Sequence, residues 1–151
     1  MDMNGEERIG APRAVVWQAL NDPEVLKACI PGCQSLEMSS PTELAATVKI
    51  RIGPVSASFT GNVLLSNLNP PESYTISGEG KGGIAGFAKG GADVHLVDEG
   101  AETLLQYTVK AEIGGKLAQL GARLIDSTSK KLAQQFFADF NARVSAMAAA
   151  G

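Results

Sequence analysis

The last third of the chain carries one long apolar stripe with the period of an α-helix, and this stripe limits the possible folds more than any other feature. Across residues 116–148 no proline interrupts the pattern, and the charged residues lie largely off the stripe. A single helix of this length would be about 50 Å long at roughly 1.5 Å per residue, so it needs a large apolar partner. The stripe comprises Leu117, Leu120, Leu124, Thr128, Leu132, Phe136, Phe140, Val144 and Met147.

The stretch between residues 34 and 113 is expected to supply that partner as an antiparallel sheet. Apolar and polar residues alternate along it, as they do in strands with one buried face, and Gly53-Pro54 is one of several turn signals between the runs. Together with a weak first strand, these runs predict seven strands. The expected strands are residues 3–9, 36–40, 43–52, 55–68, 74–80, 87–97 and 103–113.

Two short helices are expected between the first strand and the rest of the sheet. Pro12 opens one of them, and Asp22 is a suitable N-cap for the second, with Pro23 at its first position. The order of elements predicts an α+β helix-grip architecture, with a seven-stranded curved antiparallel sheet around the long C-terminal helix. In that architecture the sheet and helix enclose a cavity; a two-layer sandwich with a filled core is the alternative. A length of 151 residues favours one domain over 1–151.

Composition excludes several classes of protein. Apolar residues make up 44% of the chain and charged residues 19%, which argues against disorder, and no uncharged apolar run is long enough to span a membrane. A net charge of −3, without a basic run interleaved with aromatic residues, argues against nucleic-acid binding. The first residues lack the features of a signal peptide, so a cytoplasmic location is expected.

Catalytic and metal-binding patterns are weak. Cys29 and Cys33 have the spacing C-x-x-x-C, and with His95 as the single histidine no zinc site can be assembled from Cys and His, so both cysteines are expected to be structural or free thiols. His95 is expected on the solvated face of a strand. Residues 78–83 satisfy G-x-G-x-x-G, but no helical stripe follows, so they are expected to form a loop between strands. No catalytic residue, metal or cofactor is predicted.

Along nearly its whole length, the chain resembles the CoxG family of carbon monoxide dehydrogenase. The resemblance rests on five motifs and one further proline. They are Pro12, Val16-Trp17-x-x-Leu20-x-Asp22-Pro23-Glu24-x-Leu26, Cys29-Ile30-Pro31-Gly32-Cys33, Gly53-Pro54-Val55-x-x-x-Phe59-x-Gly61, Gly86-Phe87-Ala88-x-Gly90 and Gly114-Gly115-Lys116-Leu117-Ala118-x-Leu120-Gly121-x-Arg123.

The resemblance implies a START-like fold of the SRPBCC superfamily, also called Bet v 1-like. It further implies a non-catalytic accessory protein that links a molybdenum hydroxylase of the carbon monoxide dehydrogenase type to the cytoplasmic membrane, by peripheral contact at its inner face. Since few ionisable residues form a legible site, we expect an apolar ligand, lipid or quinone-like, in the cavity. The alternative is a cavity-poor docking or assembly factor that acts by surface contacts; a START-like cyclase or aromatase is less favoured.

Two groups of residues are expected to form the ligand site. The cavity lining should come from strand and helix stripes that face one another, and the mouth from a glycine-rich end of the sheet that carries positive charge and apolar residues. Gly121 is expected where the sheet or a ligand comes close to the helix. The predicted lining is Phe59, Tyr74, Phe87, Tyr107, Leu117, Leu120 and Leu124, and the predicted mouth or docking residues are Arg51, Lys81, Ile84 and Lys116.

Overall fold

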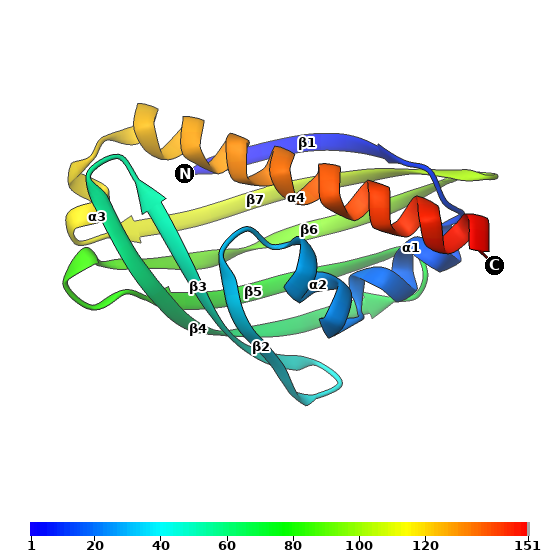
Figure 1. Ribbon diagram of the computed structural model, residues 1–151, viewed down its shortest axis with the longest axis horizontal. Helices are drawn as coiled ribbons and strands as arrows, with labels where there is room; N and C mark the ends of the chain where they lie inside the picture. The colour runs from blue at the N-terminus through cyan, green and yellow to red at the C-terminus, as the bar shows by residue number, and fades with distance from the viewer. Residues whose placement is uncertain (151) are drawn as a thin grey trace.

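The computed structural model describes residues 1–150 and shows an antiparallel sheet that curves around a long helix (Figure 1). The strands are β1 (Asp2–Ile9), β2 (Cys33–Ser40), β3 (Glu43–Ile52), β4 (Val55–Asn69), β5 (Ser73–Lys81), β6 (Phe87–Glu99) and β7 (Glu102–Gly114). The helices are α1 (Arg13–Leu20), α2 (Pro23–Cys29), α3 (Lys116–Gln119) and α4 (Ala122–Ala150), with a short 3₁₀ turn η1 (Gly83–Ala85).

The sheet is a meander whose first strand returns to close one edge. Its strand order is β1-β7-β6-β5-β4-β3-β2, and every neighbouring pair is antiparallel. The regular alternation of apolar and polar residues explains this register, because a slip by one residue would turn every apolar side chain toward solvent. The predicted seven-stranded helix-grip fold is therefore confirmed.

Helices α1 and α2 cover the end of the concave face that lies beside the C-terminal half of α4 (Figure 1). Asp22 caps α2 as expected: its Oδ1 accepts a hydrogen bond from the Glu24 backbone N–H at 2.9 Å, and Pro23 occupies the first turn. Asn141 of α4 ties the corner between β1 and α1 to the long helix, since its Oδ1 accepts from the Gly10 N–H at 2.9 Å. One end of the fold is thus closed by side chains from three helices.

The predicted single helix over residues 116–148 is wrong in one respect, because the chain breaks at Gly121. The short helix α3 ends at Gln119, and α4 begins at Ala122. Gly121 has a φ of +91°, a left-handed conformation that side chains rarely adopt. The expected close approach is also wrong, since no atom of residues 1–150 outside the local chain lies within 4 Å of a Cβ built at this position. The glycine is explained by its backbone angle.

Replacing Gly121 with alanine is expected to lower the free energy of unfolding by about 1 to 3 kcal/mol, the usual cost of holding a side chain at positive φ. Urea unfolding followed by circular dichroism measures this difference. A gain in stability of the size that helix propensity alone predicts would contradict the structural role given to the break.

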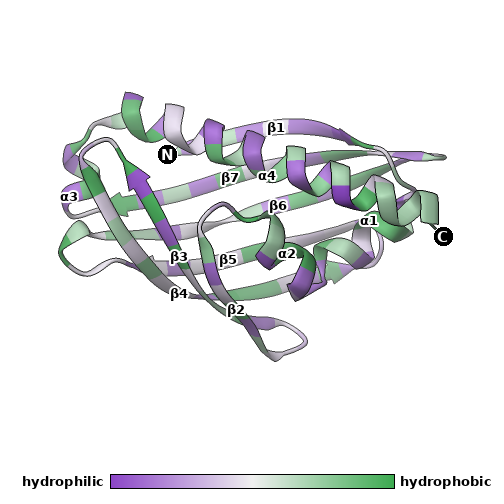
Figure 2. Cartoon of the chain, viewed as in Figure 1, coloured by the Kyte–Doolittle hydropathy of each residue, from purple (hydrophilic) through white to green (hydrophobic). Residues whose placement is uncertain are grey.

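The interior under the C-terminal half of α4 is densely packed. Phe140 and Val144 are fully buried, Phe140 stacks on Phe136 with ring centroids 5.5 Å apart, and Thr103 donates its hydroxyl to the Ala11 carbonyl at 2.8 Å. Figure 2 shows hydrophobic and hydrophilic residues along the whole length of α4, as an amphipathic helix requires. Other fully buried residues of this packed half are Ile9, Val16, Ala19, Leu96 and Leu105.

Candidate functional site

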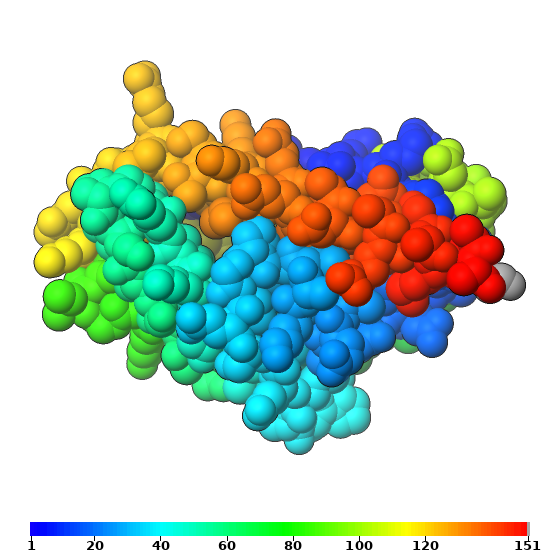
Figure 3. All heavy atoms as spheres, viewed as in Figure 1, coloured from blue at the N-terminus to red at the C-terminus, as the bar shows by residue number. Residues whose placement is uncertain are grey.

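The other half of the interior is hollow. Between the concave face of the sheet and the first half of α4 lies a cavity of about 470 Å³, within the roughly 300 to 1,000 Å³ range of pockets for small molecules. Figure 3 views the face on which β3, the first half of α4 and the segment after α2 come together around it. The long helix therefore covers a packed core at one end and a cavity at the other.

The floor of the cavity owes its depth to residues with little or no side chain. One row of paired residues across β3 to β7 reads Ala46, Gly61, Gly80, Ala88 and Ile113. The neighbouring row on the same face contains Gly78, Gly90 and Ala111. All of these residues line the cavity. Because they leave the concave face almost bare, the sheet and the helix cannot close the space between them.

The walls and roof of the cavity are apolar. Phe59 and Leu117 close the cavity at one end, and Val63 and Ile76 line it on the side of the packed half. Many lining residues remain half-buried, although they lie on the inner face, because no side chain packs against them. The roof is formed by Ile125, Ser129 and Leu132 of α4, and further lining residues are Ile30, Val48, Ile50 and Ile52.

Polar groups are sparse on the cavity surface. The Ser129 hydroxyl faces it and donates to the Met1 Sδ atom at 3.3 Å. Glu79 of β5 also lines it, but its carboxylate is 3.8 Å from the Lys81 Nζ atom, in a pair whose side chains are both exposed. A water molecule needs two to four polar partners, and a space of this size would hold roughly fifteen of them at about 30 Å³ each. The wall therefore suits an apolar molecule better than water.

The structure brings only two of the predicted lining residues, Phe59 and Leu117, to this cavity. Tyr74 lies in the packed half, where it meets Trp17 edge-on at 5.3 Å, and burial raises the pKa of its hydroxyl. Tyr107 stacks on Phe137 at 5.4 Å, and burial together with the Glu7 carboxylate raises its pKa. These two expectations are corrected because both rings fill the space under the C-terminal half of α4.

Three further lining expectations are also corrected. Phe87 alternates with the inward-facing Ala88, so its ring lies on the outer face over Gly114, where an added Cβ would meet it. Leu120 packs beside Leu117 behind the cavity wall, and Leu124 lies against the turn at Gly53. The break at Gly121 explains the last two errors, since a helical period carried across it places the wrong residues inside.

Sequence reasoning missed the floor glycines and the helical roof. Gly78 and Gly80, expected in a loop, belong to β5, and no helix starts after them as a dinucleotide site would require. Ile125, Ser129 and Leu132 were missed because one unbroken helix was assumed. Counting back in steps of three and four from the buried Phe140 would have found them.

The predicted mouth residues do come together at one end of the molecule. Arg51 ends β3, Lys81 ends β5, Ile84 lies in η1 and Lys116 begins α3, and all four are exposed. We call this region, formed by residues 51–55, 81–87 and 114–120, the η1–α3 end. Here Ala85 packs with Phe59 and Leu117, so side chains close the cavity toward this end.

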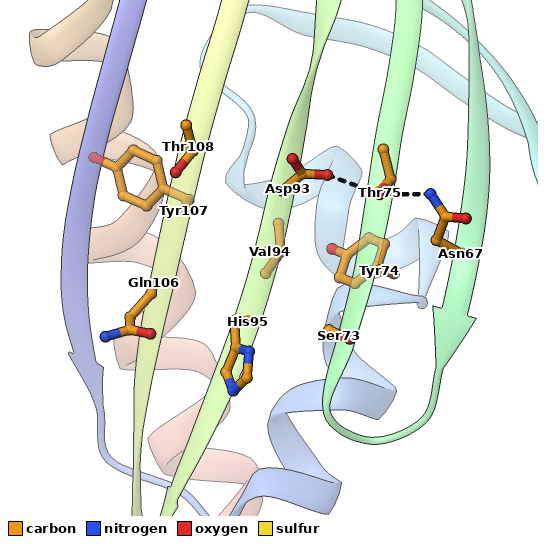
Figure 4. A pocket seen from close by; sticks show the side chains of 10 residues that line it. All are labelled: Asn67, Ser73, Tyr74, Thr75, Asp93, Val94, His95, Gln106, Tyr107 and Thr108. Carbon is orange, nitrogen blue, oxygen red and sulfur yellow. Dashed lines mark hydrogen bonds between the residues drawn. The ribbon is translucent and has the colours of Figure 1, made fainter.

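A second pocket, of about 360 Å³, lies on the outer face of the sheet, away from the helices (Figure 4). It is polar: Asn67 Nδ2 donates to Thr75 Oγ1 at 3.1 Å, and Thr75 Oγ1 donates to Asp93 Oδ1 at 2.8 Å. His95 is exposed beside them, which confirms the expected solvated strand histidine. These polar groups satisfy one another on an open surface, and the apolar cavity is the stronger candidate site.

Both cysteines are free thiols in the described chain, as expected. Cys29 is buried, and desolvation raises the pKa of its thiol, although the Arg143 guanidinium nearby opposes this shift. Cys33 is half-buried and donates weakly to the Ser35 carbonyl at 3.4 Å.

Iodoacetamide is therefore expected to alkylate Cys33 in the native protein and to spare Cys29, since reaction needs an accessible thiolate. Mass spectrometry of tryptic peptides, with the urea-unfolded protein as the control, measures both rates. Equal native rates would contradict the burial of Cys29.

Two structural findings bear on other kinds of site. Across residues 1–150, no three His, Cys, Asp or Glu side chains gather where they could hold a metal ion. Over the same residues, each helix is too short or too polar to cross a membrane.

The curved sheet, the long helix across it and the apolar cavity between them define the START-like class, a fold suited to hydrophobic ligands. A START superfamily protein from Mycobacterium smegmatis has a TM-score of 0.74 at 15% identity, over 97% of this chain and 98% of that chain. The Zhui aromatase/cyclase from Streptomyces sp. R1128 has a TM-score of 0.65 at 9% identity, over 95% and 93% of the two chains. At these identities the likeness concerns the fold alone.

Within this class, the chain belongs to the CoxG family of carbon monoxide dehydrogenase, whose family model matches residues 5–145. A conserved protein from Geobacillus kaustophilus, known from its crystal structure, has a TM-score of 0.90 at 30% identity, over 96% of this chain and 95% of that chain. No curated protein sequence matches the chain.

Proposed function

We propose that the protein carries an uncharged apolar molecule, a lipid or a quinone-like compound, in the cavity under the first half of α4. The observation that carries this proposal is the bare floor of the cavity. Glycine and alanine occupy neighbouring positions on four adjacent strands, and about 470 Å³ of space remains over them. In a packed core, such voids are few and cost stability unless something fills them.

The wall chemistry supports a neutral ligand. A charged group buried there would need a counter-charge or several hydrogen-bond donors, whereas α4 offers the single hydroxyl of Ser129. The same chemistry supports a non-catalytic role. Among the described lining residues, no nucleophile lies beside a general base, and the hydroxyl of Ser129 is directed to a methionine sulfur.

Family membership supports the choice of partner. We propose that the protein links a molybdenum hydroxylase of the carbon monoxide dehydrogenase type to the membrane, as an accessory protein at the cytoplasmic face. A carrier of an apolar molecule is a suitable link between the two, since such a molecule dissolves in the bilayer and must cross water to reach an enzyme. This role needs peripheral and reversible contact with the lipid surface.

Native mass spectrometry of the purified chain tests the cavity as a carrier site. The expected spectrum contains a second species, heavier by the mass of one organic molecule, which solvent extraction recovers as an apolar compound. A chain that is bare after mild purification, and that also takes up no added Nile red, would instead support the docking factor that acts through surface contacts alone.

A further inference from the structure

The η1–α3 end exposes one large apolar side chain to an unusual degree. Ile84 is 84% exposed, whereas the other exposed large apolar residues, Leu64, Leu68 and Met147, reach 45%, 41% and 37%. Ile84 lies at the tip of the connection between β5 and β6, where a polar residue would be better solvated. It extends beyond the body of the fold and is available to an apolar partner.

Backbone contacts hold Ile84 in this exposed position. Three backbone hydrogen bonds close the turn, among them Gly82 N–H to the Gly86 carbonyl at 2.8 Å. Gly86, with a φ of +113°, sits so close to β7 that an added Cβ would overlap the Gly114 carbonyl. The turn is therefore seated on the start of the α3 segment, and the exposure of Ile84 follows from a defined conformation.

The exposed tip connects directly with the cavity. Ala85, which follows Ile84, is 5% exposed and packs with Phe59 and Leu117. Both of those side chains line the cavity on their other side. One layer of side chains thus separates the tip from the cavity. The layer includes Leu117 of α3, a segment bounded by Gly115 and Gly121, both at positive φ.

Charge distinguishes this end from the opposite one. Arg51, Lys81 and Lys116 surround the tip, while Glu79 and Glu112 lie one row back in register with Lys89. The turns at the opposite end carry the exposed acidic residues Glu43, Glu72, Asp98, Glu99 and Glu102. In a chain with a net charge of −3, this separation would orient the η1–α3 end toward an anionic surface.

We propose that the η1–α3 end docks on an anionic lipid bilayer, with Ile84 inserted among the headgroups, and that the apolar ligand passes between bilayer and cavity at this end by displacing Leu117. The proposal rests on the function proposed above. It adds the surface that meets the membrane and the route that the ligand takes. Lysine and arginine side chains provide attraction to anionic lipid, and the isoleucine provides apolar insertion.

Co-sedimentation with vesicles of phosphatidylglycerol and phosphatidylcholine at low salt tests the docking surface. We expect Ile84→Ser to lower the partition coefficient about tenfold, because it removes the burial of one large apolar side chain. Lys116→Gln should lower it about fivefold on these vesicles and leave binding to pure phosphatidylcholine unchanged. Leu68→Ser, which removes an exposed leucine of similar size near the acidic end, is the matched control and should bind as the parent does.

A second measurement follows the transfer of Nile red from the same vesicles to the protein. Ile84→Ser should slow this transfer about tenfold, in proportion to its weaker docking, while equilibrium dye binding without vesicles stays at the parent level. Failure of the parent to bind dye would overturn the carrier function itself. The docking proposal is overturned by dye binding with no vesicle binding, by equal binding of Ile84→Ser and parent, or by an equal loss in Leu68→Ser. Ile84-dependent capture of a purified dehydrogenase, without vesicle binding, would likewise overturn it and assign the surface to a protein partner.

Discussion

Replacing Phe140 with alanine should lower the free energy of unfolding by about 3 to 5 kcal/mol, the usual cost of removing a large aromatic side chain from a dense core. Phe140 is 0% exposed and stacks on Phe136 with ring centroids 5.5 Å apart. Its neighbours include residues of β1, α1 and β6 in the same packed cluster, so little of the resulting cavity can collapse. Urea unfolding followed by tryptophan fluorescence and circular dichroism measures the change.

The matched substitution lies two turns earlier on the same helix. Leu132→Ala should cost about 1 kcal/mol, well below the roughly 2 to 5 kcal/mol of a leucine in a packed core, because its side chain already borders empty space. The pair of variants compares the two halves of the interior within one helix. Losses of similar size per removed carbon atom would show that the interior is uniformly packed and would contradict the hollow half.

The second large effect is expected at the cavity floor. Gly80→Val should weaken Nile red binding at least about tenfold, since the new methyl groups occupy the space that a ligand would fill and displace its contacts. The fold has room for them: the nearest atom to an added Cβ at Gly80 is Phe59 Cβ at 3.8 Å, an ordinary contact. The stability should stay level or rise by about 0.5 to 1 kcal/mol, because glycine weakens the interior of a strand.

Gly80 is the informative glycine on the floor because its neighbours differ. At Gly61 an added Cβ would overlap the Glu79 carbonyl, so a substitution there would test the sheet and not the ligand. Ser58→Val, on the exposed outer face of β4, is the control for added methyl groups and should bind the dye normally. Unchanged dye binding by a folded Gly80→Val protein would mean that the dye binds elsewhere.

The fold could be predicted because its signals are local and repeated. Alternation in β3 and β4, the Asp22-Pro23 helix start and the stripe that includes Phe136 and Phe140 each specify an element and the face that it buries. Antiparallel pairing of consecutive strands then leaves few topologies. The family motifs pointed to the same helix-grip arrangement, which the structure confirms.

The cavity was harder to predict because it is formed where side chains are missing. A glycine such as Gly78 or Gly80 indicates a turn as readily as a bare strand face, and only the register with Gly61 and Ala88 shows that these positions lie side by side. A tyrosine on an inward stripe, such as Tyr74, gives no indication of which half of the interior it fills. The lining therefore depends on long-range register, which composition and periodicity do not contain.

Methyl-resolved NMR during titration with decylubiquinone, a quinone with a short apolar tail, tests most directly whether the hollow half binds an apolar ligand. The methyl signals of Ile50, Ile113 and Leu132 should shift with a common saturation curve, because these residues line the cavity. The signals of Ile9, Leu96 and Leu105, buried in the packed half, should move little. Shifts confined to the packed half or to Leu64 on the outer face, or no shifts at all, would contradict the proposed site.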